Sequence, residues 1–237
     1  NFIGIKEVMN YTVSDLRPYI DWTFFFIAWE MKKLYPDILE DSAYGKEAKK
    51  IFNDANKMLY FIEENNIVDI KGVFGIFKAN SNGDNIELYN KDKSLAATFN
   101  LFREQRKKNK GPYLCLSDFI APKEINKDDY LGGFIVTTGL KTDEYVKKLE
   151  SEGDSYNAIM LKLVYDRLAE AFAEKLHEDI RKNYWGYAKD ENLSMKEIFK
   201  ASYRGIRPAF GYPSLIDQSQ MKILFNLLNG EKVTGVK

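Results

Sequence analysis

The spacing of apolar residues changes twice along the chain, and this limits the folds available to it. Between 42 and 65, apolar residues recur at three- and four-residue steps, which is typical of an amphipathic helix. From about 68 to 138, short β-branched and aromatic runs alternate with turn-forming residues, which predicts strands. From 155 to 184, apolar residues recur every fourth position, which predicts the longest helix. This order favours an α+β class, with a twisted antiparallel sheet flanked by helices.

Four strands are expected in the central segment. They span 72–77, 85–89, 114–120 and 131–138. The first two are separated by the turn-rich stretch 80–84, so they are expected to form a hairpin. Gly132 and Gly133 fall inside the last strand and indicate a bulge or a close backbone approach.

Further helices are expected at 22–33, after Ser194, and after 217–220. Asp21 stands at the N-cap position of the first, and Gly230 is expected to end the last. There is no internal repeat and no long Pro-, Gly- or Ser-rich linker. One domain over 1–237 is therefore expected.

The composition excludes several classes of function. Acidic and basic residues balance at 35 each, so charge gives no reason to expect a nucleic-acid partner. One Cys and one His make a thiolate- or imidazole-rich metal site and an internal disulfide unexpected, which suits a cytoplasmic protein. The longest apolar run, 24–29, is too short to cross a bilayer, so no membrane partner is expected. The first residue is Asn, which is compatible with a piece of a longer polypeptide.

A stiff loop is predicted between two helical segments, where the sequence reads RPAFGYP (207–213). Its two prolines fix φ, and its glycine permits a close approach to a ligand. Arg207 opens the loop, and arginine can hold a carboxylate or phosphate through two parallel hydrogen bonds. The residues alone favour a simpler interpretation, in which the loop connects two helices and Arg207 pairs with a surface acid.

The same loop resembles the Arg-x-x-x-Gly-Tyr signature of the activation domain of cobalamin-dependent methionine synthase. Other segments are similar to the same family, in the family's order and over nearly the whole chain. They are DWT (21–23), LYPDILED (34–41), CLSDFIAPK (115–123), DRLAEAFAEKLHE (166–178) and YWGYA (184–188). The family continues beyond the equivalent of residue 237 into a segment with a ligand-contacting aromatic pair, and that segment is missing here.

The resemblance implies S-adenosylmethionine as the ligand. It implies that Arg207 meets the α-carboxylate, that Asp21 or Glu170 meets the positively charged groups, and that Ala209, Gly211 and Tyr212 hold the adenine. The residues alone favour a helix cap at Asp21, and they favour a solvated acidic edge in which Glu170 and Glu174 pair with Arg167 and Lys175. His177 lacks a surrounding catalytic motif and is expected to be structural.

The resemblance also implies the partners. Cobalamin would be bound by another domain of the parent enzyme, and a flavodoxin or flavoprotein reductase would supply one electron before S-adenosylmethionine remethylates the reduced cobalt. No catalytic residue is expected in this chain, because no nucleophile, triad, P-loop or metal spacing is present. The chain is therefore interpreted as a binding domain of a methyltransferase that is not catalytic alone.

Three functions are compatible with these residues. The first is a ligand-binding activation domain, and the second is a docking module for the reductant without a ligand of its own. For docking, Lys33 is the first candidate, and Arg106 in the basic run 103–110 belongs to the second. A nucleic-acid-binding domain using that run is the third and weakest, since the chain is neutral overall.

Overall fold

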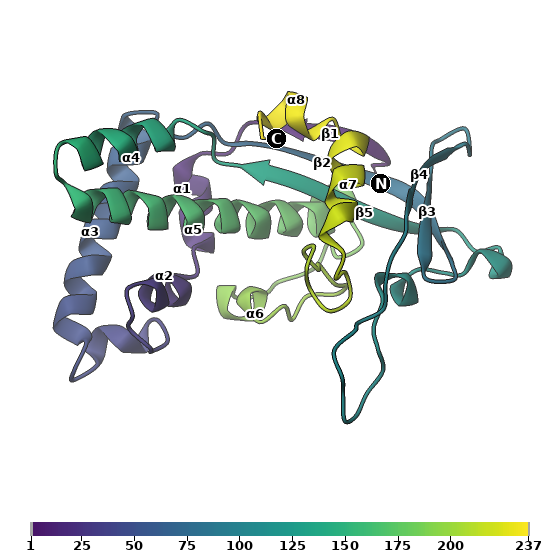
Figure 1. Cartoon of the computed structure of the whole chain (residues 1–237), viewed down its shortest axis with the longest axis horizontal. Coiled ribbons are helices and arrows are strands. Elements are labelled where there is room, and N and C mark those ends of the chain that lie inside the picture. Colours follow the sequence, from purple (N-terminus) through teal and green to yellow (C-terminus); the bar gives the residue numbers. More distant parts are fainter. Residues whose placement is uncertain (1, 237) are drawn as a thin grey trace.

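The structure, a computed structural model, describes residues 2–236 and contains a five-stranded antiparallel sheet flanked by helices (Figure 1). The strands are β1 (Gly4–Val8), β2 (Lys71–Asn82), β3 (Asn85–Tyr89), β4 (Leu95–Phe99) and β5 (Asp129–Thr137). The helices are α1 (Val13–Leu16), α2 (Trp22–Ala28), α3 (Gly45–Glu64), α4 (Thr142–Ser151), α5 (Ser155–Asp179), α6 (Met195–Phe199), α7 (Met221–Leu227) and α8 (Gly230–Thr234). The expected α+β class is confirmed.

β2 is the central strand of the sheet and has three partners. β1 pairs with residues 72–76 and β3 with residues 78–82, while β5 pairs with residues 71–79. A residue in a sheet has one neighbour on each side, so β1 and β3 share one edge of β2 and β5 takes the other. The expected hairpin is the β2–β3 pair, which turns at Gly83. β4 extends the sheet beyond β3.

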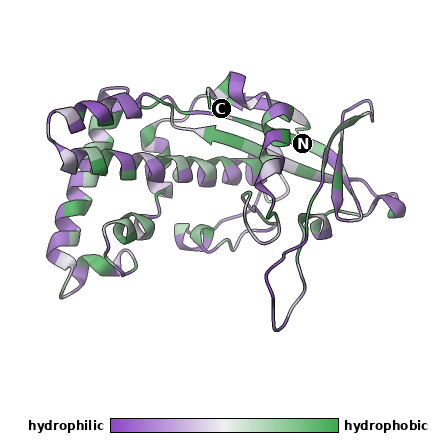
Figure 2. Ribbon diagram, in the orientation of Figure 1, coloured by the Kyte–Doolittle hydropathy of each residue, from purple (hydrophilic) through white to green (hydrophobic). Residues whose placement is uncertain are grey.

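Alternate residues of β2 face two different apolar clusters. Phe74 and Ile76 point into a large cluster made with α1, α2, α3 and α5. Val73 and Phe77 point the other way, into a smaller cluster that includes Leu228 at the end of α7. Figure 1 shows α5 along one face of the sheet and α8 on the opposite side, and Figure 2 shows hydrophobic residues along β5 between them. Both faces of the sheet are therefore covered.

α5 is the long helix predicted from the four-residue spacing. Five residues of that stripe are almost fully buried: Met160, Val164, Leu168, Phe172 and Leu176. A four-residue stripe drifts around a helix of 3.6 residues per turn, so successive members face different neighbours. α5 indeed packs against α1, α2, α3, α4 and β5.

The expected strand at 114–120 is wrong, because the chain forms a short 3₁₀ turn at Leu116–Phe119. Asp118 caps this turn by accepting a hydrogen bond from the Cys115 backbone at 2.9 Å. Arg103 then holds the same carboxylate through two hydrogen bonds of 2.7 and 2.8 Å. These side-chain contacts satisfy backbone groups that would otherwise pair with a neighbouring strand. The pattern of apolar residues in 114–120 does not reveal such contacts, so it predicts a strand.

Other boundaries also differ from expectation. α2 ends at Ala28, well before residue 33, because the chain turns through a left-handed conformation at Glu30. Gly230 does not end a helix but opens α8. β1 and β4 have no counterpart among the expected strands, because each has only one fully buried residue and therefore a weak alternating pattern.

Gly75 and Gly133 are paired across β2 and β5 beneath α7. The register of this pair runs without interruption, so the expectation of a bulge is wrong. The close approach comes from helix side chains instead of another backbone: a Cβ on Gly133 would lie 2.6 Å from Leu224 Cδ1, and one on Gly75 would lie 2.7 Å from Leu228 Cδ2. The absence of two Cβ atoms therefore lets α7 pack closely on the sheet.

Gly133→Ala is expected to lower the free energy of unfolding by about 1–3 kcal/mol, because the added methyl group overpacks this contact. Thermal and urea unfolding would measure the loss. Gly132→Ala is the matched control, since its Cβ would lie 3.2 Å from the Trp185 ring on a more open side. Equal stability of the two variants would contradict the close packing of α7.

Candidate functional site

Arg207 pairs with Glu174 of α5. The Nη2 atom of Arg207 donates to Oε1 of Glu174, and both side chains are mostly buried, with exposed fractions of 22% and 17%. Two further buried atoms, Arg207 Nε and Glu174 Oε2, have no hydrogen-bond partner among residues 2–236. A donor and an acceptor left unpaired at one ion pair are costly unless another molecule meets them. The acid that meets Arg207 is thus partly buried, in contrast to the surface acid expected from the residues alone.

Burial raises the pKa of Glu174, with the negative charge of Glu170 acting in the same direction and Arg207 opposing both. Glu170 is exposed and lies one turn away on α5. The expected surface pairing of the two acids is wrong: Lys175 pairs with Asp179 at 2.8 Å, and Arg167 lies over the Phe24 ring at 5.9 Å. Sequence spacing could not choose between Glu170 and Glu174, because both follow the same face of α5.

The loop after Arg207 folds back on itself. The Gly211 amide donates to the Leu215 carbonyl, and the Leu215 amide donates to the Tyr212 carbonyl, both at 2.8 Å. Gly211 has φ of +97°, and a Cβ there would lie 2.9 Å from Gln218 Nε2, so glycine suits this position.

Only part of the loop's backbone stays open to a ligand. The Ala209 carbonyl accepts from the Tyr212 amide at 3.1 Å. No hydrogen bond between described residues uses the Ala209 amide or the Gly211 carbonyl. The Tyr212 side chain is 61% exposed. One donor, one acceptor and an aromatic ring are therefore presented at the loop surface.

Asp21 caps α2, as its sequence position indicated. Its Oδ1 accepts from the Thr23 amide at 2.9 Å, and its backbone is extended, as an N-cap requires. No hydrogen bond between described residues uses Oδ2. The cap therefore leaves one carboxylate oxygen for another donor, and the structural and ligand-binding interpretations are compatible.

No hydrogen bond among residues 2–236 joins Asp21 to Arg207. The segment before Asp21 and the loop that begins at Arg207 both contact α5. Two residues before Asp21, the Tyr19 hydroxyl donates to Glu178, one turn after Glu174. Figure 1 shows α2 and α6 on the same side of α5. α5 is thus the common support of the predicted site residues.

A buried polar cluster lies at the C-terminal end of α5, where the helix continues into a π-helical turn at Ile180–Tyr184. Arg181 is fully buried, donates to Glu191 at 2.5 to 3.2 Å, and stacks on the Tyr203 ring at 4.2 Å. It also lies 2.8 Å from His177 Nδ1, and because arginine only donates, Nδ1 must accept. This cluster joins α5 to Glu191 and Tyr203, and so holds the segment that leads to Arg207. Nothing in the sequence points to the Arg181–Glu191 pair beyond its lying next to YWGYA (184–188).

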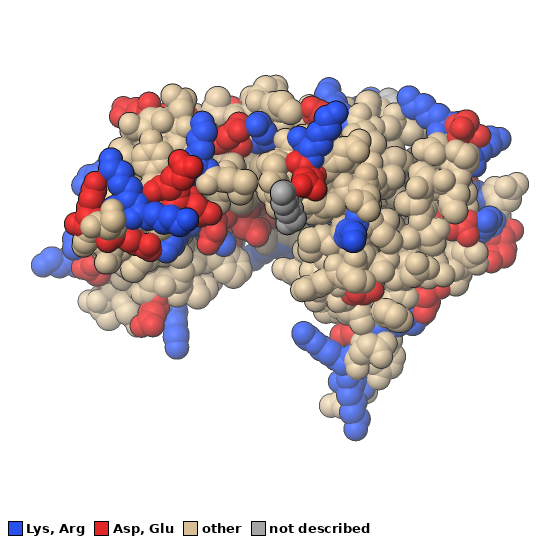
Figure 3. Space-filling view, turned by 45° about the horizontal axis from the view of Figure 1, so that its top comes forward, with Lys and Arg blue, Asp and Glu red and all other residues tan. Residues whose placement is uncertain are grey.

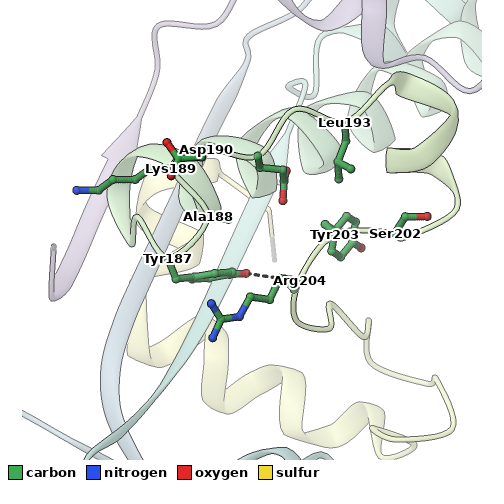
Figure 4. Close-up of a pocket in the computed structure, with 9 residues that line it drawn as sticks. Tyr187, Ala188, Lys189, Asp190, Leu193, Ser202, Tyr203 and Arg204 are labelled. Carbon is green, nitrogen blue, oxygen red and sulfur yellow. Dashed lines mark hydrogen bonds between the residues drawn. The ribbon is translucent and has the colours of Figure 1, made fainter.

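A hollow of about 330 Å³ opens beside this cluster (Figure 4). It is lined on one side by residues 187–191 and Leu193, and on the other by Ser202, Tyr203 and Arg204. The Tyr187 hydroxyl donates to the Arg204 carbonyl at 3.2 Å across it. The hollow is bounded by the segment that ends three residues before Arg207, so it adjoins the candidate site in sequence.

Lys33, the first candidate for partner docking, is exposed and pairs with Asp41. Asp41 also accepts from the Ala43 and Tyr44 amides at 2.9 Å, and this set of bonds lowers its pKa to about 2. The same contact raises the pKa of Lys33. Lys33 therefore has a local structural role whether or not a partner meets it.

Between residues 2 and 236, no three His, Cys, Asp or Glu side chains come together as metal ligands would. None of the described helices is long and apolar enough to span a membrane.

The chain is similar to known proteins over nearly its whole length. The family described as "Vitamin B12 dependent methionine synthase, activation domain" matches residues 12–237. A solved structure described as "Crystal Structure of the MetH Reactivation Domain bound to AdoHcy" is 45% identical in sequence, with a TM-score of 0.94. The match covers 99% of this chain and 73% of that one.

His177 generates a prediction about acid stability. Burial lowers its pKa to about 3, with Arg181 and Arg207 adding repulsion. In the unfolded chain the histidine has an ordinary pKa near 6.5. Between pH ~6.5 and ~3 the unfolded chain therefore binds a proton at this residue and the folded chain does not. The stabilisation is complete above pH ~6.5 and falls towards pH ~3 by up to about 1.4 kcal/mol per unit.

His177→Gln keeps an acceptor for Arg181 and removes this titration. The free energy of unfolding should therefore fall less steeply with acid in the variant than in the parent protein between pH ~6.5 and ~4. Urea titrations at a series of pH values would measure both slopes. Parallel curves would show that His177 titrates alike in the folded and unfolded states.

Proposed function

Because the chain belongs to the activation-domain family of vitamin B12-dependent methionine synthase, we propose that it binds S-adenosylmethionine at the Arg207–Glu174 pair. The observation that carries this proposal is the pair of unpartnered buried atoms, Arg207 Nε and Glu174 Oε2. The amino-acid end of S-adenosylmethionine carries a carboxylate and an ammonium group side by side. The carboxylate satisfies an arginine donor and the ammonium satisfies a carboxylate oxygen, so one ligand group meets both needs.

The other predicted site residues are proposed to meet the remaining parts of the ligand. Asp21 supplies a second negative charge for the ammonium or sulfonium through its free Oδ2, and exposed Glu170 adds to the negative potential. For the adenine, the Ala209 amide and the Gly211 carbonyl offer one donor and one acceptor, and the Tyr212 ring offers a stacking face. The AdoHcy bound to the similar reactivation domain is chemically close to this ligand, which supports the choice.

The proposed task of the chain is to orient a methyl group. When bound, S-adenosylmethionine supplies that methyl to the reduced cobalt of cobalamin, which another domain of the parent enzyme holds. Displacement at carbon needs the reacting atoms in line and in near contact, so a fixed anchor matters more than an acid or base. Arg207 is fixed by Glu174, and the Arg181–Glu191 cluster holds the segment before it.

The electron donor is proposed to be a flavodoxin or flavoprotein reductase that docks at a basic surface, and Lys33 is one candidate residue for it. Lys33 is exposed on the segment that follows α2, close in sequence to Asp21. A docking module without its own ligand is the alternative function. The unpaired polar atoms at Arg207 and Glu174 favour the ligand-binding proposal, since docking alone leaves them unsatisfied.

Arg207→Ala is expected to weaken S-adenosylmethionine binding by about 2–3 kcal/mol, roughly 30- to 150-fold, the scale of a lost charge-assisted pair. Calorimetry on the complete activation domain would measure it. The variant leaves Glu174 without its cation, so the double variant Arg207→Ala/Glu174→Gln separates lost affinity from lost stability. Arg17→Ala is the control, because Arg17 donates to Asn56 and Tyr60 at 2.7 and 2.8 Å elsewhere. Unchanged affinity in Arg207→Ala would refute the site.

Asp21→Asn tests the charge apart from the cap. The amide oxygen still accepts from Thr23, so the melting temperature should hold, while affinity for S-adenosylmethionine should fall by about tenfold for a lost charge contact. Asp154→Asn is the matched control, since Asp154 caps α5 by accepting from the Asn157 amide at 3.1 Å. If both variants bind like the parent protein, Asp21 is only a cap.

A further inference from the structure

A loop at residues 102–113, called here the basic loop, projects from the body of the molecule between β4 and the turn at Leu116. Figure 1 shows it extending away from the sheet, and Figure 3 shows Lys and Arg side chains gathered on the projection. Its cations are Arg103, Arg106, Lys107, Lys108 and Lys110.

Two of these cations hold the loop in place. Arg103 bonds both oxygens of Asp118, lies 2.8 Å from Asp84 Oδ1, and donates to the Tyr113 carbonyl at 3.0 Å. Lys108 pairs with the buried Glu104 and donates to the Pro112 carbonyl at 3.0 Å. The Glu104 amide also bonds the Leu114 carbonyl at 2.9 Å. The base of the loop is therefore clamped across its two arms.

The other three cations do not take part in holding the loop. Arg106, Lys107 and Lys110 are exposed, and none of them forms an ion pair with another described residue. Two large apolar side chains flank the base of the loop, Phe102 at 60% exposure and Tyr113 at 44%. A clamped loop that presents unpaired positive charges beside exposed aromatic rings has the composition of a docking surface.

The basic loop is also joined to the loop that carries Arg207. The Leu116 amide, just after the basic loop, donates to the Ser214 carbonyl at 2.8 Å. A hollow of about 300 Å³ lies between the two loops, lined by Glu104, Gln105 and Arg106 on one side and Gly211, Pro213 and Ile216 on the other. A partner seated on the basic loop would therefore lie beside the proposed ligand site.

We propose that the tip of the basic loop docks an acidic protein surface, and, resting on the proposed function, that this surface belongs to the electron donor. Unpaired cations on a projecting element attract an acidic partner and raise its association rate. Nucleic acid fits less well, since three cations neutralise few phosphates and the chain is neutral overall. Lys33, by contrast, is already paired with Asp41.

The test uses Lys107→Glu/Lys110→Glu in the complete enzyme, with an oxidised flavodoxin as the probe. Dissociation constants are measured at about 0.05 M and 0.5 M salt, where screening is weak and strong. The loop variant should bind at least ~10-fold more weakly at low salt, with the difference shrinking at high salt. Lys46→Glu/Lys147→Glu is the matched control, because both lysines are exposed, lack an ion pair among the described residues, and make the same change in net charge.

Equal binding by the loop variant and the parent protein would overturn the proposal, as would an equal loss in the control variant or no flavodoxin binding by the parent protein. A loss confined to Lys33→Glu would place docking at Lys33 instead and overturn it too. Tighter binding of a short DNA duplex than of flavodoxin, abolished in the loop variant, would reassign the loop to nucleic acid. S-adenosylmethionine affinity measured on the same proteins tests the proposed function separately, and the loop variant should leave it unchanged.

Discussion

The burial of α5 sets the geometry of the whole molecule. Its apolar stripe drifts around the helix and packs on β5 and on four other helices, so little of the helix surface stays polar. The acids Glu170, Glu174 and Glu178 follow one another at four-residue steps on the part that remains. The Arg207 loop and Tyr19 both attach to that acidic strip. The packing that stabilises the core therefore also decides where the functional segments meet.

The polar cluster at the end of α5 buries a charged side chain, which costs free energy, and its contacts offset that cost. A fully buried Arg181 loses its hydration, and it is compensated by two hydrogen-bonded partners and an aromatic face. His177 stays neutral there, so no second positive charge is buried. An apolar cluster could stabilise the fold as well, but it would not fix the direction in which the segment through Tyr203 leaves α5.

Much of the fold follows from the sequence, because α5, α3 and the β2–β3 hairpin have clear periods or turns. The segment 114–120 does not, because Asp118 and Arg103 satisfy its backbone through side chains that no local period reveals. In the site, the cap at Asp21 is recognisable because capping is local. The choice of Glu174 as the partner of Arg207 is not, since it depends on how a loop 33 residues away folds back over the helix.

The raised pKa of Glu174 links the site to protons as well as to a ligand. Burial disfavours the charged form, so this side chain holds a proton more tightly than a carboxyl group in water does. A cation placed against it favours the charged carboxylate, so the proton leaves as the cation arrives. Association at this pair is then an exchange of one positive charge for another, and the heat it releases includes the ionisation enthalpy of whichever buffer accepts the proton.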